Sequence, residues 1–155
     1  MNKLPHIPTA LLLSTTLTTV MVTIHHVFRL GPEFLAPAAV LIAAPLVTMR
    51  WLSTRGSRSA LSSLVFVNGF IFVWFGLVDG IFDHVFKAIG LENMTLLPGG
   101  EADMVETYYS LGSQGANAAF YEGTGLIQAL ASLAMLYLTY RFVQQQWRSA
   151  HALAL

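Results

Sequence analysis

Four long apolar stretches constrain the fold of this chain more than any other feature. A transmembrane helix needs about 20 mostly apolar residues to cross about 30 Å of hydrocarbon. The stretches that meet this requirement cover residues 7–28, 34–51, 60–89 and 118–142. The sequence therefore predicts an all-α integral membrane protein, with residues 1–155 forming a single transmembrane domain.

The composition supports this prediction and excludes several classes of function. Of the 155 residues, 55% are hydrophobic and only 10% are charged, whereas a soluble domain carries about 25% charged residues. Cysteine is absent, which excludes disulfides, thiolate metal ligands and a cysteine nucleophile. The formal net charge is zero, so we expect the lipid bilayer and not nucleic acid as a partner.

The charge distribution predicts how the helices cross the membrane. Four spans place both termini and the loop 51–59 on one side, which carries six cations and no acid: Lys3, Arg50, Arg55, Arg58, Arg141 and Arg148. All eight acids lie on the opposite side. An excess of Lys and Arg marks the cytoplasmic face. The prediction is an antiparallel, up-down four-helix bundle with both termini inside.

This orientation also predicts where the long polar loop lies. With the termini in the cytoplasm, we expect the protein in the cell membrane, which is the inner membrane in a bacterium. The acidic loop 90–117 is then expected to face the periplasm or the cell exterior. Within this loop, residues 101–111 are expected to form a short interfacial helix. Tyr108 and Tyr109 would then lie at the level of the lipid headgroups.

Ionisable residues from all four stretches fall at one depth, near the outer boundary. Residues 60–78 span about 28 Å as an α-helix, which places Asp79 at the edge of the hydrocarbon and Asp83 and His84 one turn further out. The other stretches bring four more ionisable residues to this level: His25, His26, Glu33 and Glu122. The sequence therefore predicts a ring of histidines and carboxylates at this end of the bundle.

Helical spacing separates the ionisable residues of the third stretch into two stripes. Asp79 and Asp83 share one stripe at i and i+4. His84 shares the adjacent stripe with Gly76 and Gly80. Gly76-x-x-x-Gly80 is a small-x-x-x-small pattern, which lets a neighbouring helix approach closely. We therefore expect His84 to face a packed helix.

The chemistry of the ring indicates a site for a divalent transition metal. Imidazole nitrogen and carboxylate oxygen are ligands for Zn, Fe, Mn and Cu(II), and helix bundles draw such ligands from several helices. The first candidates are His26, Asp79, Asp83, His84 and Glu122, followed by His25 and Glu33. Metal-assisted catalysis and metal handling both remain open. The many carboxylates favour a bare cation over a haem held by His26 and His84.

Three alternatives stay open at this point. The ring can be an ion-pair cluster in which Arg29 and Lys87 neutralise acids that the hydrocarbon excludes. It can also be a catalytic or proton-handling site without a metal. The protein as a whole can be a non-catalytic subunit or assembly factor of a larger membrane complex. His25 and His26 are adjacent, so at most one of them is expected to face the bundle.

Two polar residues lie deeper in the predicted spans. Asn68 and Gln128 are each expected to form a hydrogen bond to another helix. Because few other polar residues share this depth, a transport path through one copy of the chain is not expected. Gly125 and Ala129 form a small-residue face on the fourth stretch, which suits close helix packing.

Overall fold

The computed structural model describes residues 5–91 and 106–152, and their secondary structure is helical with no strand. α1 (Thr9–Leu30) leads through a short 3-10 turn, η1 (Pro32–Phe34), into α2 (Leu35–Arg55). α3 (Arg58–Ile71), η2 (Phe72–Val85) and α4 (Phe86–Ala88) follow one another without a break, and α5 covers Gln114–Ala152. The predicted four apolar helices are confirmed, because Thr9–Leu30, Pro32–Arg55, Arg58–Ala88 and Gln114–Ser149 are each long and apolar enough to cross a membrane.

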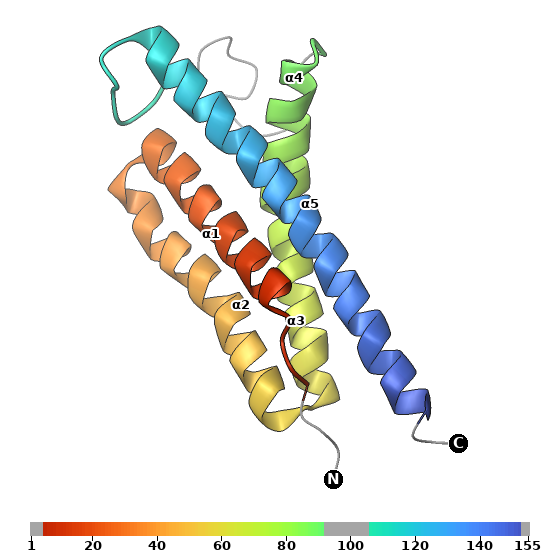
Figure 1. Ribbon diagram of the computed structural model, residues 1–155. Helices are drawn as coiled ribbons and strands as arrows, with labels where there is room; N and C mark the ends of the chain where they lie inside the picture. The colour runs from red at the N-terminus through yellow and green to blue at the C-terminus, as the bar shows by residue number, and fades with distance from the viewer. Residues whose placement is uncertain (1–4, 92–105, 153–155) are drawn as a thin grey trace.

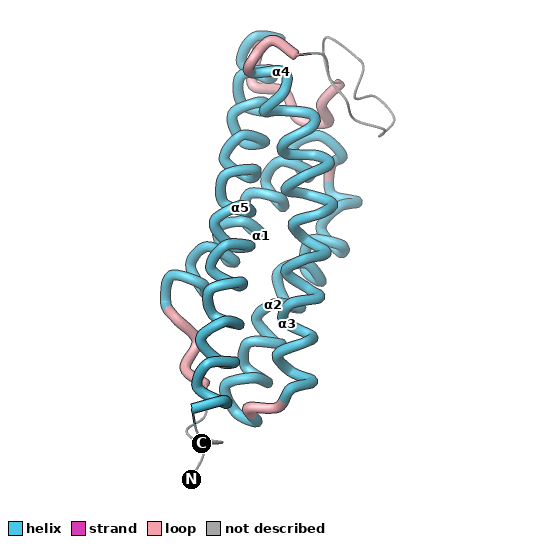
Figure 2. The backbone as a smooth tube through the Cα atoms, turned by 90° about the vertical axis from the view of Figure 1, so that its right-hand side faces the viewer, coloured by secondary structure: helices cyan, strands magenta, loops and turns pink. Residues whose placement is uncertain are grey.

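The four helical segments lie side by side as an elongated bundle, with both termini near the same end (Figure 1). A view turned by 90° shows the same side-by-side arrangement (Figure 2). α5 is longer than predicted, because it begins at Gln114 and continues to Ala152. The polar stretch Gln144–Gln146 therefore extends the helix beyond the apolar span instead of ending it.

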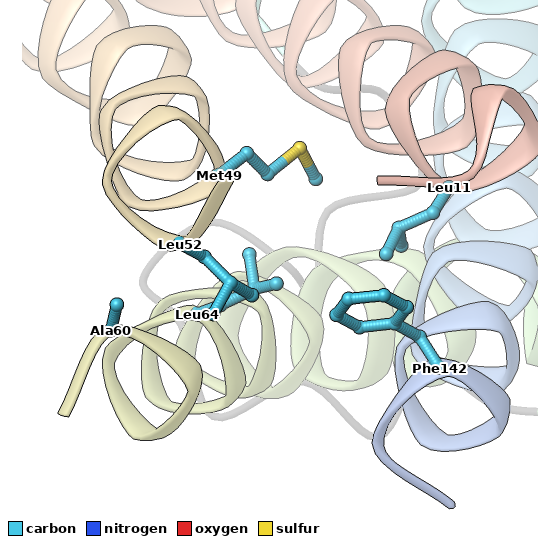
Figure 3. Close-up of a cluster of buried hydrophobic side chains, with 6 residues drawn as sticks. All are labelled: Leu11, Met49, Leu52, Ala60, Leu64 and Phe142. Carbon is cyan, nitrogen blue, oxygen red and sulfur yellow. The ribbon is translucent and has the colours of Figure 1, made fainter. Parts of the chain in front are cut away.

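An apolar cluster joins all four segments near the end that holds the termini (Figure 3). Its members are Leu11 from α1, Met49 and Leu52 from α2, Ala60 and Leu64 from α3, and Phe142 from α5. Each of these side chains is at most 3% exposed. Lipid tails are as apolar as these side chains, so close van der Waals packing and not burial from water holds such a cluster together in a bilayer.

The third segment packs closely against α5 through small residues, as predicted. Gly76 lies against Ser132, and a Cβ at Gly80 would sit 2.9 Å from the Cβ of Ala129. The predicted interhelical hydrogen bond of Asn68 is also confirmed, since its Nδ2 donates to Thr139 Oγ1 over 2.9 Å. The glycines thus allow the two backbones to approach along the face that carries the polar cluster.

The π-helical geometry of η2 changes which residues share a face. Phe86 N–H donates to the carbonyl of Ile81, five residues earlier, as a π-helix requires. In an α-helix, Asp79 and His84 would point about 140° apart. With hydrogen bonds between residues five apart, they lie one turn from each other. The predicted stripe of Gly76, Gly80 and His84 does face a packed helix, α5. That Asp79 turns toward the same point as His84 was not predicted, because the spacing argument assumed α-helical geometry throughout.

The segment before α5 caps the end of α1. Backbone N–H groups of Tyr108 and Tyr109 donate to the carbonyls of Arg29 and Phe28 over 3.1 and 3.3 Å. The Tyr108 ring lies over Gly31, whose φ of +83° suits glycine. The predicted helix over 101–111 is absent from its described part, residues 106–111. Its remaining residues, and residues 92–105 of the predicted outer loop, lie outside the described parts.

Candidate metal centre

Two helical segments bring together three side chains of types that can bind a metal. His25 comes from α1, and Asp79 and His84 come from η2. All three are buried, with exposures of 0%, 2% and 0%. The Nε2 atoms of the two histidines are 3.2 Å apart, and His25 Nε2 is 3.8 Å from Asp79 Oδ2. One ligand atom from each residue lies within 4.8 Å of the others.

The hydrogen bonds around His25 determine which of its nitrogens carries the proton. His25 Nδ1 is 2.9 Å from Thr124 Oγ1. The Thr124 hydroxyl also lies 2.8 and 2.9 Å from the carbonyls of Phe120 and Tyr121, which can only accept its one proton. The hydroxyl oxygen therefore accepts a hydrogen bond from His25 Nδ1–H. In the neutral ring, Nε2 then carries a lone pair.

His84 is held in the same tautomer by a carboxylate. Its Nδ1 lies 2.8 Å from Glu122 Oε2, and an ionised carboxylate can only accept. Lys87 Nζ donates to the other oxygen of Glu122 over 2.7 Å, which favours the ionised form. His84 Nδ1–H is therefore the donor, and a lone pair remains on Nε2 of the neutral ring.

Two nitrogens with lone pairs thus lie 3.2 Å apart, on rings whose planes are 85° from parallel. Such an arrangement is repulsive unless a cation or a proton lies between the nitrogens. Two nitrogen ligands of one tetrahedral ion, each about 2.1 Å from it, are separated by about 3.4 Å. The observed separation of His25 and His84 is close to this value.

Asp79 adds a negative charge to the same position. Its Oδ2 accepts a hydrogen bond from Gln128 Nε2 over 2.6 Å, which fulfils the prediction of an interhelical bond for Gln128. Among the described residues, the ion-pair partners of Asp79 are His25 and His26, at 3.8 and 3.9 Å. A cation bound between His25, His84 and Asp79 would compensate this buried charge.

α5 contributes none of the three candidate ligands. Three of its own side chains each form a hydrogen bond to one of them. Thr124 bonds His25, Glu122 bonds His84, and Gln128 bonds Asp79. Gly125 lies directly against the His84 ring, so any Cβ at this position would overlap the imidazole. Partners of this kind fix the orientation of metal ligands in known sites.

The other predicted ligands lie around this group or outside it. Glu122 contacts His84 through Nδ1, on the side of the ring away from His25. Asp83 Oδ2 is 3.9 Å from His84 Nε2 and is buried. Glu33 is exposed in η1 and does not join the cluster, because the turn after Gly31 places it outside the bundle.

The structure reverses the predicted order of the adjacent histidines. The expectation that at most one of His25 and His26 faces the bundle was wrong, since their Nε2 atoms lie 3.8 and 3.9 Å from the two oxygens of Asp79. The two histidines point in different directions along α1, and each approaches a different oxygen of the same Asp79 carboxylate. His26 Nδ1–H donates to the carbonyl of Val22 over 3.0 Å, so His26 also turns Nε2 inward.

Sequence reasoning missed Tyr121 and Thr124. The Tyr121 ring stacks on His25 with ring centroids 4.2 Å apart, and its hydroxyl accepts from Arg29 over 3.0 Å. Tyr121 is 2% exposed. Its position beside Glu122, within the predicted stretch 118–142, was the available signal. Together with Glu122 and Gln128, these side chains make α5 one wall of the site.

Comparison with known proteins finds no matching family model, no matching curated protein and no matching solved structure.

Proposed function

We propose that this protein is an integral membrane metalloprotein that binds one divalent transition metal ion through His25, Asp79 and His84. The observation that carries the proposal is the 3.2 Å separation of two buried Nε2 atoms whose opposite nitrogens are both engaged as donors. An ion at this position removes the repulsion between the lone pairs. It also compensates the buried charge of Asp79.

A shared proton is the alternative occupant, and it corresponds to a proton-handling site without a metal. A proton between His25 and His84 would also relieve the repulsion. The resulting positive charge would attract Asp79, but it would leave Asp79 Oδ2 3.8 Å from His25 Nε2, too far for a hydrogen bond. A metal ion uses all three groups, which is why we favour it.

The donor set limits which metals suit the site. Two imidazole nitrogens and a carboxylate oxygen fit Zn, Fe, Mn or Cu(II). Ca and Mg prefer sites built from oxygen ligands. A haem does not fit between His25 and His84, because axial nitrogens on opposite faces of one iron lie about 4 Å apart, with the macrocycle between them. The observed separation is 3.2 Å.

The proposal includes the orientation of the bundle in the membrane. The positive charge near the termini supports an antiparallel, up-down arrangement in the cell membrane with both termini cytoplasmic. The metal centre would then lie toward the periplasmic or extracellular side, near the end of α1. A role as a non-catalytic subunit of a larger complex remains the alternative at the level of the whole protein.

Elemental analysis tests the metal proposal. The full-length protein, purified in detergent, is measured by inductively coupled plasma mass spectrometry before and after metal loading. The His25→Ala and His84→Ala variants are compared with His6→Ala, which changes an exposed histidine remote from the group. We expect about one metal ion per wild-type or His6→Ala chain and loss in the other two variants. A folded wild type that stays metal-free after loading would refute the proposal.

A further inference from the structure

We propose that the bound metal carries one exchangeable water molecule, which donates a hydrogen bond to the side-chain carbonyl of Gln128. This inference rests on the proposed function and specifies its chemistry, because it assigns the site an open coordination position. A site closed by four protein ligands serves structure, whereas a site with three protein ligands and water serves reaction or ligand exchange.

The number of available protein ligands leaves a position open. Among the described residues, only His25, Asp79 and His84 offer ligand atoms that all lie within 4.8 Å of one another. His26 and Asp83 approach single members of the group at 3.9 Å and do not complete it. A tetrahedral ion held by three protein ligands therefore has a fourth position for a small molecule.

Gln128 supplies the second observation, because its carbonyl oxygen has no partner. Gln128 is 0% exposed, and its Oε1 makes no hydrogen bond in the structure. Its Nε2 donates to two acceptors, Asp79 Oδ2 at 2.6 Å and the Phe75 carbonyl at 2.5 Å. Exchanging the amide oxygen and nitrogen would set oxygen against oxygen at both contacts. The orientation of the amide is therefore fixed by its partners.

An unpaired buried carbonyl beside a metal ligand is the feature that a bound water would explain. Leaving such an acceptor unsatisfied costs about 1 to 3 kcal/mol. Metal-bound water is a strong hydrogen-bond donor, since the ion withdraws charge from its oxygen. One water molecule bound to the ion would fill the open coordination position. The same water would donate a hydrogen bond to Gln128 Oε1.

This arrangement indicates the chemical class of ligand that the site takes. A neutral donor such as water, or the hydroxyl group of a small substrate, suits a position that faces a carbonyl oxygen. An anion would displace the water less readily, because Gln128 Oε1 repels negative charge. The 0–2% exposure of the three ligands restricts access to small molecules.

The exchangeable water can be detected directly in the copper-loaded, full-length protein. We expect pulsed electron paramagnetic resonance in D₂O to show a strongly coupled exchangeable deuteron, and azide to shift the visible spectrum in a saturable manner. If copper is bound and neither signal appears, the proposal of a metal-bound water is refuted and the proposal of a metal site is not. A protein that binds no metal under any loading condition would overturn both.

Gln128→Met tests the acceptor, and Ser132→Ala, one turn further along α5, is the matched control. Gln128→Met removes the carbonyl together with the amide that donates to Asp79 and to the Phe75 carbonyl, and it leaves the three metal ligands in place. We expect copper to remain bound and the Kd of azide to fall roughly 3- to 10-fold, as the loss of one hydrogen bond to water predicts. The control should bind azide as the wild type does. An unchanged azide Kd in copper-loaded Gln128→Met would refute the role of Gln128.

Discussion

The 2.8 Å contact between His84 Nδ1 and Glu122 Oε2 connects a fully buried imidazole to a carboxylate whose side chain is 28% exposed. It determines the tautomer of His84 and leaves Nε2 free to bind a metal. Lys87 Nζ holds the other oxygen of Glu122 over 2.7 Å, with 36% of its own side chain exposed. The orientation of the buried ligand thus depends on an ion pair that water reaches.

Replacing Glu122 should weaken metal binding without unfolding the protein. Glu122→Ala removes the acceptor of His84 Nδ1–H, and the loss of such a partner typically lowers metal affinity 10- to 100-fold. Glu122→Gln retains an acceptor oxygen and should have a smaller effect. Chelator competition measures the affinity, and Glu33→Ala is the control because Glu33 is exposed in η1. Equal affinities in Glu122→Ala and the wild type would contradict the role of this contact.

A pair of glycines two residues apart on α5 provides a steric test of the site. A Cβ at Gly125 would overlap the His84 ring, whereas a Cβ at Gly123 meets nothing within 4 Å. Gly125→Ala should therefore lower stability by about 1 to 3 kcal/mol, as overpacking does, and should reduce metal content. Gly123→Ala should be neutral, or stabilising by up to about 1 kcal/mol through helix propensity.

Thermal unfolding and metal analysis of the two alanine variants measure the difference. The substitution is identical in both and lies on the same helix, so general effects on α5 cancel. If Gly125→Ala matched Gly123→Ala in both stability and metal content, the close packing of α5 on His84 would be wrong.

Much of the fold follows from the sequence, because the length and hydrophobicity of a span are local properties. The four apolar stretches, the close packing at Gly76 and Gly80, and the bond made by Asn68 were all predictable in this way. The pairing of Asp79 with His84 was not, since it depends on the π-helical hydrogen bonds of η2. No local signal in the sequence indicated that the helix would change its period.

The candidate site was only partly predictable for a related reason. Position along a span indicated that His25, Asp79, His84 and Glu122 lie at similar depth, but depth alone does not give direction around the helix. Glu122 was expected to be a ligand, whereas it bonds the nitrogen of His84 that faces away from His25. Assigning such roles requires the relative rotation of three helices, which only the packed structure provides.

The hydrogen bond between Asn68 and Thr139 should contribute modestly to stability. Asn68 Nδ2 donates to Thr139 Oγ1 over 2.9 Å in a fully buried position. Double-mutant cycles on interhelical hydrogen bonds in a membrane protein average about 0.6 kcal/mol, with a maximum near 1.7. A cycle of Asn68→Leu and Thr139→Val, followed by denaturant unfolding in detergent, should give a coupling energy in this range. A coupling energy of zero would show that the bond does not stabilise the fold.

The absence of cysteine makes the membrane orientation directly testable, because one introduced cysteine provides a unique label. Ser59 is exposed in the first turn of α3, and Ser110 is exposed in the segment that precedes α5. With both termini cytoplasmic, a membrane-impermeant maleimide applied to intact cells should label Ser110→Cys and not Ser59→Cys. After permeabilisation, both should be labelled.

In the same experiment, Leu130→Cys tests whether the exposed surface of α5 faces lipid or water. Leu130 is 67% exposed on the outer surface of α5, so water would reach a cysteine there if the bundle were soluble. In a bilayer this position faces lipid, and the impermeant reagent should fail to label it even after permeabilisation, because a thiol in hydrocarbon neither ionises nor meets the reagent. Labelling of Leu130→Cys in intact membranes would refute the placement of α5 in the bilayer. Labelling of Ser59→Cys in intact cells would instead reverse the orientation and place the metal centre toward the cytoplasm.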